Sequence, residues 1–135
     1  MKILGLDSSG MVAGVAIVED GLLLAEYTTN YKKTHSQTLL PMVEEIVSML
    51  GIDLKELDAI AVAEGPGSFT GIRIGVSTAK ALAVVNNIPV VGVTSLEGLA
   101  YNIKKDTGII CSLIDANNHQ VYCGIFDNNY NLVNF

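Results

Sequence analysis

The sequence from residue 59 to residue 75 reads AIAVAEGPGSFTGIRIG. Its first part, residues 59–64, consists mostly of small apolar residues and predicts a strand that is buried on both faces. A glycine-rich loop follows at residues 65–71, and the apolar pattern then continues as a helix to about residue 86. A buried strand that leads through such a loop into a helix favours an α/β fold.

Three strands are expected before this stretch, at residues 2–7, 12–18 and 22–28. Residues 19–21, Glu-Asp-Gly, form a hairpin turn signal, so the chain should open with antiparallel strands and not with a strand–helix–strand unit. A helix is expected at about residues 36–50, because its large apolar residues recur on one face. These residues are Leu39, Val43, Ile46, Val47 and Leu50.

A further strand at residues 88–93 and a helix at 96–105 are expected after the central helix, with Thr94-Ser95 as the helix cap. The pattern of the opening is then repeated, because the apolar strand from Gly108 ends in Asp115 as the first strand ends in Asp7.

Strands at residues 108–114, 121–127 and 130–135 would make a second copy of the first unit. The predicted domains are therefore residues 1–107 and 108–135. Because the second copy stops before its helices, the chain is expected to be a fragment of a longer protein. The alternative is that the last strands extend the first sheet.

Composition limits the function. Half of the 135 residues are hydrophobic, so the chain should bury a core. The net charge of −6 and a single arginine, Arg73, argue against direct binding of nucleic acid. No apolar stretch approaches the ~20 residues that span a bilayer. Asp7 comes too early for a signal peptide, so a cytoplasmic protein is expected.

The two cysteines, Cys111 and Cys123, are too few for a disulfide framework. They are expected to be buried, reduced thiols. The sequence contains no C-x-x-C pair, which excludes a zinc knuckle.

The glycine-rich loop has two possible roles. Its backbone N–H groups and the following helix could hold an anion, or the glycines could simply permit a tight turn. It is not a Walker A loop, because Gly71 is followed by Ile72-Arg73, and Thr70 breaks the dinucleotide pattern. Asp7 could likewise hold hydrated magnesium, or the turn could be stabilised by its own hydrogen bonds. The candidate nucleotide or anion residues are Asp7, Ser8, Ser9, Gly65, Gly67, Ser68 and Thr70.

Small residues recur every four positions on the helix after the loop, at Gly71, Gly75, Ala79 and Ala83. Such a stripe lets a neighbouring helix approach closely. The rest of this helix is mostly apolar, so both of its sides need cover from the sheet, the first helix or a partner. On the first helix, Met42 and Met49 flank the apolar face and could be a contact surface or core residues.

Catalytic groups are sparse. His35 and His119 are the only histidines, which does not supply a catalytic zinc site. Ser68 has no evident base, and no Gly-x-Ser-x-Gly elbow is present. The chain by itself is therefore not expected to be an enzyme.

Residues 65–75, GPGSFTGIRIG, resemble the signature of the TsaB (YeaZ) family. Residues 3–9 match the opening of that family, and residues 35–41 resemble its first-helix motif, although Gln37 stands where the family usually has Glu. Residues 79–83 and 92–97 also fit. Residues 117–119, Asn-Asn-His, depart from the basic residues that are common there, which puts an anionic contact at this place in doubt.

The resemblance implies an actin-like (ASKHA, ribonuclease H-like) fold: a mixed sheet flanked by helices, with the start of a second similar unit. It implies a partner of the catalytic paralogue TsaD and of the ATPase TsaE, which together transfer a threonylcarbamoyl group to an adenosine of tRNA. The chain would contact tRNA only indirectly and bind no cofactor tightly, with ATP and magnesium possible only in the complex. The alternative is an actin-like ATPase or phosphotransferase that uses Asp7, Ser9 and the glycine loop.

In that family the first two helices form the dimer interface, either with a second copy or with TsaD. The residues expected there are His35, Leu39, Met42, Glu45, Ile46, Met49, Gly71, Ile72, Arg73, Gly75, Val76, Ala79, Lys80 and Ala83.

Overall fold

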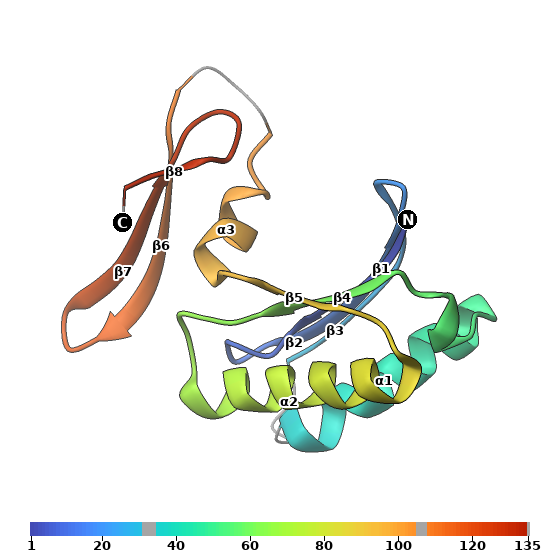
Figure 1. Cartoon of the computed structure of the whole chain (residues 1–135). Coiled ribbons are helices and arrows are strands. Elements are labelled where there is room, and N and C mark those ends of the chain that lie inside the picture. The colour runs from blue at the N-terminus through green and yellow to red at the C-terminus, as the bar shows by residue number, and fades with distance from the viewer. Residues whose placement is uncertain (31–34, 105–107, 135) are drawn as a thin grey trace.

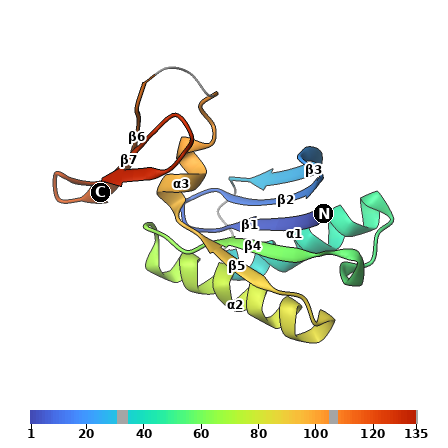
Figure 2. The ribbon, with the colours of Figure 1, turned by 45° about the horizontal axis from the view of Figure 1, so that its top comes forward.

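A mixed five-stranded sheet forms the first half of the computed structural model, which describes residues 1–30, 35–104 and 108–134. The strand order is β3-β2-β1-β4-β5 (Figures 1 and 2). The first three strands are antiparallel and β4 and β5 run parallel to β1, which is the arrangement of the predicted actin-like, ribonuclease H-like fold. The strands are β1 (Lys2–Asp7), β2 (Ala13–Glu19), β3 (Leu22–Thr29), β4 (Ala59–Ala63) and β5 (Val90–Val93).

Two helices, α1 (His35–Leu50) and α2 (Phe69–Asn86), lie on the same face of this sheet (Figure 1). The core forms between them and the sheet, where inward-facing strand residues alternate with residues of the other face. Its fully buried members include Leu4, Ile17, Leu39, Val43, Ile46 and Ile60. The helix periodicity therefore predicted the inward face of α1 correctly.

β4 is buried on one face only, so the prediction of two buried faces was wrong. Ile60 and Val62 point into the core, whereas Ala59, Ala61 and Ala63 stay half-buried. On the same face of β1 and β2, Gly5, Gly14 and Ala16 are small and half-buried, as are the larger Ile3 and Val18. On β4, the small residues thus marked the less covered face of the strand.

α3 (Ser95–Ala100) is shorter than the predicted helix at 96–105. It begins as expected, because the Thr94 hydroxyl accepts a hydrogen bond from the Glu97 N–H at 3.1 Å and the Glu97 carboxylate accepts one from the Thr94 N–H at 2.9 Å. It ends early because its last turn tightens into i→i+3 hydrogen bonds, and the Ile103 carbonyl accepts from the Tyr130 hydroxyl at 2.8 Å. A short 3₁₀ helix, η1 (Leu54–Glu56), carries a similar cap on Asp53.

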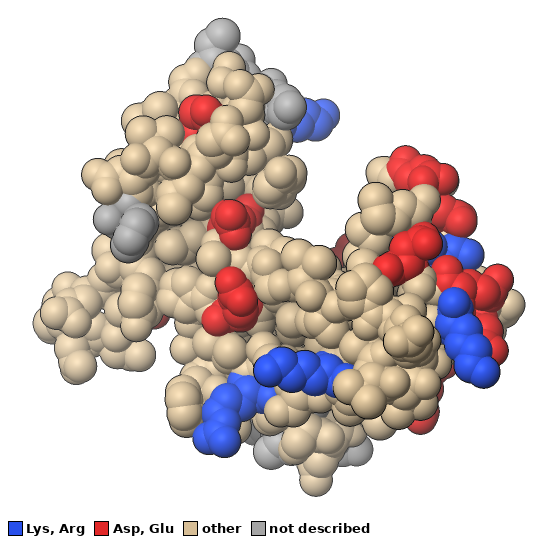
Figure 3. Space-filling model, in the orientation of Figure 1, with Lys and Arg blue, Asp and Glu red and all other residues tan. Residues whose placement is uncertain are grey.

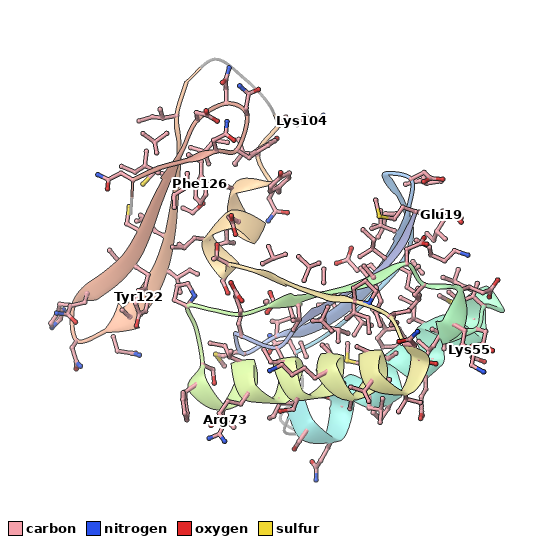
Figure 4. All side chains as sticks on the ribbon, viewed as in Figure 1. Glu19, Lys55, Arg73, Lys104, Tyr122 and Phe126 are labelled. Carbon is pink, nitrogen blue, oxygen red and sulfur yellow. The ribbon has the colours of Figure 1, made fainter. Side chains whose placement is uncertain are left out.

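The last three strands, β6 (Ile110–Asn117), β7 (Gln120–Phe126) and β8 (Leu132–Asn134), form a second antiparallel sheet in the order β6-β7-β8. They do not extend the first sheet, which was the alternative. One face of this sheet packs on α3 through Gly124 and the buried Phe126 (Figure 4). Stacked rings of Tyr101 and Tyr130, 4.2 Å apart, add a second contact. The division at residue 107 stays a prediction.

The small-residue stripe of α2 is buried within its own chain. Gly71, Gly75, Ala79 and Ala83 are the buried residues of this helix. A Cβ on Gly75 would lie 2.6 Å from the Ser8 hydroxyl oxygen and 3.6 Å from a methyl group of Val62. The close approach that the stripe predicted is therefore made to the ends of β1 and β4, and the stripe is not open to a partner.

Gly75→Ala should lower the free energy of unfolding by about 1–3 kcal/mol, because the new methyl group displaces the buried Ser8 hydroxyl. At an open helix position the same change should stabilise by up to about 1 kcal/mol. Gly98→Ala in α3 is the matched control, since a Cβ there meets no atom within 4 Å. Urea unfolding of both variants measures the difference; a Gly75→Ala chain as stable as Gly98→Ala would contradict the close packing.

Candidate functional site

The turn after β1 is held by its own side chains. One carboxylate oxygen of Asp7 accepts hydrogen bonds from the Ser9 N–H at 2.8 Å and the Ser9 hydroxyl at 2.7 Å. The buried Ser8 hydroxyl donates to the Gly71 carbonyl at 2.7 Å. These are the hydrogen bonds expected if the turn serves mainly to hold the structure together.

The glycine loop closes on this turn. The Ser68 N–H donates to the Ser9 carbonyl at 2.6 Å, and a Cβ on Gly67 would lie only 2.4 Å from that oxygen. Gly65 has a φ of +101°, which favours glycine, and its carbonyl accepts from the Ser95 N–H at 2.8 Å. The Ser68 hydroxyl caps α2 by accepting from the Gly71 N–H at 3.2 Å. The N–H groups of Ser68 and Gly71, which could otherwise hold an anion, therefore serve the packing.

A cleft of about 650 Å³ opens beside the contact between the glycine loop and the turn after β1. It lies between the first sheet, α3 and β6 (Figure 3). The carboxyl ends of β1 and β4 and the start of α3 line its polar end, with Asp7, Ser9 and Gly67 among the lining residues. Of the predicted nucleotide residues, these three meet at the cleft. Ser8 and Gly65 are buried, and neither Ser68 nor Thr70 lines it.

The predicted interface residues fall into three groups. The exposed ones are Glu45, Met49, Arg73 and Lys80, while Ile72 and Val76 are half-buried. The side chain of His35 lies outside what the structure describes. The remaining seven are buried in the core of the chain: Leu39, Met42, Ile46, Gly71, Gly75, Ala79 and Ala83. Of the two methionines, Met42 is thus a core residue, and only Met49 is available for contact.

Large apolar side chains are exposed on the outward sides of α1 and α2. Exposed fractions are 43% for Leu40, 63% for Met49, 73% for Phe69, and 81% for both Val84 and Val85. The residues Leu40, Glu44, Glu45, Met49, Phe69, Arg73, Lys80, Val84 and Val85 are called the helical face below. Five members of the helical face were not among the predicted interface residues: Leu40, Glu44, Phe69, Val84 and Val85. Had the glycine stripe been assigned to the core, Phe69 and Val84 on the opposite side of α2 would have been predicted as exposed.

The charges of the helical face are divided between its two helices. The only charged residues of α2 are Arg73 and Lys80, whereas the only acidic residues of α1 are Glu44 and Glu45. Arg73 lies on the side of α2 turned away from the sheet, its guanidinium 5.3 Å from the centre of the Phe69 ring (Figure 4). On α1, the negative charge of Glu45 and a hydrogen bond between Glu45 and Tyr27 raise the pKa of Tyr27, which lies on β3.

Within the described residues, no group of three histidine, cysteine or acidic side chains is placed to hold a metal ion. A search of the same residues finds no helix whose length and apolar character would let it cross a membrane.

Comparison with known proteins gives consistent matches. The family model described as TsaD, tRNA N6-adenosine threonylcarbamoyltransferase, matches residues 23–134. The tRNA threonylcarbamoyladenosine biosynthesis protein TsaB of Bacillus subtilis is 41% identical over 126 residues. The protein of the same name from Escherichia coli is 36% identical over 124 residues. The chain belongs to the TsaB (YeaZ) family.

The match extends to the fold. The solved structure of YeaZ from Pseudomonas aeruginosa superposes with a TM-score of 0.87 at 31% identity, covering 99% of this chain and 65% of that one. The chain spans about half the length of its TsaB relatives: 93% of it covers 55% of the Bacillus subtilis protein, and 90% covers 53% of the Escherichia coli protein.

The departure from the TsaB pattern at residues 117–119 lies in the turn between β6 and β7. Asn117, Asn118 and His119 all have positive φ values, of 63°, 52° and 61°. Asparagine tolerates this left-handed conformation better than most residues. The two asparagines therefore suit the backbone of the turn.

The hydrogen bonds of Asp7 predict how this TsaB-family chain responds to substitution. Asp7→Asn keeps an oxygen that can accept both bonds from Ser9, so its unfolding free energy should stay within about 0.5 kcal/mol of the wild type, whereas Asp7→Ala should lose about 1 kcal/mol. Urea unfolding measures both, and magnesium-ATP should shift neither midpoint. A wild-type midpoint that rises with magnesium-ATP, while that of Asp7→Asn does not, would instead assign the carboxylate to a metal–nucleotide site.

Proposed function

We propose that the chain acts in the cytoplasm as a non-catalytic partner in the formation of threonylcarbamoyladenosine in tRNA, and that it docks through the helical face. The observation that carries this proposal is the exposure of five large apolar side chains on the outward sides of α1 and α2. Exposed apolar surface that polar residues border marks protein–protein contact sites. The TsaB names of the relatives supply the pathway.

The non-catalytic role is supported by the way the polar groups beside the cleft are used. The Ser8 hydroxyl, the Ser9 carbonyl and the Ser68 N–H all hold the end of β1 against the start of α2. Groups engaged in this way would have to break the packing of α2 to bind a phosphate. The function of the family motif in this chain is therefore to position the helical face.

The partner is a protein of the same fold. Because α2 presents Arg73 and Lys80 and α1 presents Glu44 and Glu45, a two-fold copy can place each α1 against the other α2 with opposite charges facing. The chain by itself pairs as a homodimer, and the catalytic paralogue TsaD, which offers the same pair of helices, replaces one copy. The ATPase TsaE and tRNA then join this complex, and tRNA contacts the chain only indirectly.

Reciprocal charge reversal tests the pairing. One chain carries Arg73→Glu and Lys80→Glu, and a second carries Glu44→Lys and Glu45→Lys. Each alone should self-associate at least about tenfold more weakly, because like charges then face each other, while a mixture of the two should pair as well as the wild type. Size-exclusion chromatography with light scattering measures this. The control for the first chain is Lys55→Glu with Lys104→Glu, two exposed lysines off the helical face.

The second arm adds purified TsaD from the same organism. A one-to-one complex should replace the homodimer of the wild type and of the control. If TsaD bound the Arg73→Glu, Lys80→Glu chain as tightly as the wild type, TsaD and the second copy would not share a surface, which would contradict the proposal. If the mixed variants failed to pair, the two-fold arrangement would be wrong.

A further inference from the structure

Two thiols meet on the outer face of the second sheet. Cys111 of β6 and Cys123 of β7 lie with their sulfur atoms 3.5 Å apart, although they are 12 residues apart in the chain. In the register of the hairpin, Cys111 faces Ile125 and Cys123 faces Leu113, so that the cysteines are diagonal neighbours on one face. The pairing of the strands, and not chance proximity of loops, brings the two sulfurs together.

Neither thiol is protected by burial. Cys111 is exposed, Cys123 is half-buried, and both are free. The prediction that the cysteines would be buried was wrong, because it is the other face of this sheet that packs on α3, through Gly124 and Phe126. On the cysteine face, the neighbouring Leu113 and Val121 are also more than half exposed, so a small oxidant can reach both sulfurs.

We propose that Cys111 and Cys123 form a dithiol site that a low-molecular-weight disulfide oxidises to an intrachain disulfide bond. A disulfide needs sulfurs about 2.0 Å apart, so the present contact must close by only about 1.5 Å. Rotation of two partly exposed side chains can supply this movement. A zinc site fits less well, because zinc takes four ligands and no third ligand joins the two cysteines among the described residues.

The reaction proceeds in two balanced steps. The Cys111 thiolate attacks one sulfur of the oxidant, for example oxidised glutathione, forms a mixed disulfide and releases one glutathione thiolate. Cys123 then loses its proton to solvent and attacks the Cys111 sulfur, which expels the second glutathione thiolate. Two protein thiols are oxidised and one molecule of glutathione disulfide is reduced to two of glutathione.

The order of attack follows from the environment of the two sulfurs. The hydrogen bond with Cys111, followed by burial, raises the pKa of Cys123. Cys123 therefore keeps its proton longer, and the more exposed Cys111 is the attacking group. Since the two strands already hold the sulfurs in contact, the second step is intramolecular and outruns a second glutathione molecule.

The bond would lock the β6–β7 hairpin. It joins Cys111, the second residue of β6, to Cys123 in the middle of β7, away from the register shift between Asp115 and Asn117. Oxidation should thus fix the pairing of the second sheet while leaving α1 and α2, and the helical face, unchanged.

The test is incubation of the purified chain with oxidised glutathione, followed by alkylation with iodoacetamide and intact mass spectrometry. The wild type should lose two hydrogens and carry neither glutathione nor alkyl groups, at all protein concentrations. Cys123→Ser should stop at one stable glutathione adduct on Cys111, because it has no second thiol to resolve it. A wild type that keeps two alkylatable thiols, accumulates glutathione adducts or links into dimers would overturn the proposal.

A second measurement separates the folded hairpin from chance encounter in a flexible chain. The ratio of reduced to oxidised glutathione at half-oxidation is compared in buffer and in concentrated urea. If folding brings the sulfurs together, the folded chain should stay oxidised at a ratio at least about tenfold more reducing than the unfolded chain. Equal ratios in the two solvents would show that the fold contributes nothing to the bond, and would overturn the proposal.

Discussion

The orientation of α2 on the sheet depends on how closely this helix approaches the end of β1. Gly67 and Gly75 leave no room for a side chain at this contact, and the Ser8 hydroxyl fills the space between β1 and the helix. The hydrogen bond from Ser68 to Ser9 ties the loop to the turn. Because these contacts turn the glycine and alanine stripe of α2 inward, they also turn Phe69, Val84 and Val85 outward.

This arrangement connects the family motif to function through position and not through chemistry of its own. A glycine loop before a helix can bind an anion with its free N–H groups, but here the Ser68 and Gly71 N–H groups are paired within the chain. The Ser68 and Gly71 N–H groups at the contact between the glycine loop and the turn after β1 are thus hydrogen-bonded within the chain. The outward sides of α1 and α2, in contrast, expose apolar side chains and opposite charges to water. This is why we propose the helical face as the docking surface for a partner of the same fold.

The elements could largely be predicted from the sequence, since strand and helix periods and turn residues are local signals; α1, α2 and the first three strands were placed within about two residues. The helix at 96–105 was overextended, because the Tyr130 hydroxyl that binds the Ile103 carbonyl comes from the distant turn between β7 and β8. The direction of α2 was uncertain for a similar reason, since a stripe of small residues suits a sheet and a partner equally. Leu39, Met42 and Ile46 were assigned to an interface through the family resemblance and belong to the core, where the periodicity of α1 had already placed Leu39 and Ile46. The meeting of Cys111 with Cys123 depends on strand register, which the sequence does not state.

Amide hydrogen exchange, measured on the chain alone and saturated with TsaD, is the most direct test of docking on the helical face. Binding there predicts slower exchange across the exposed ends of α1 and α2, around Leu40, Met49 and residues 84–86, with no change in β6 and β7. Slower exchange confined to the second sheet or to the cleft beside α3, with α1 and α2 unchanged, would contradict it and place the partner elsewhere on the molecule.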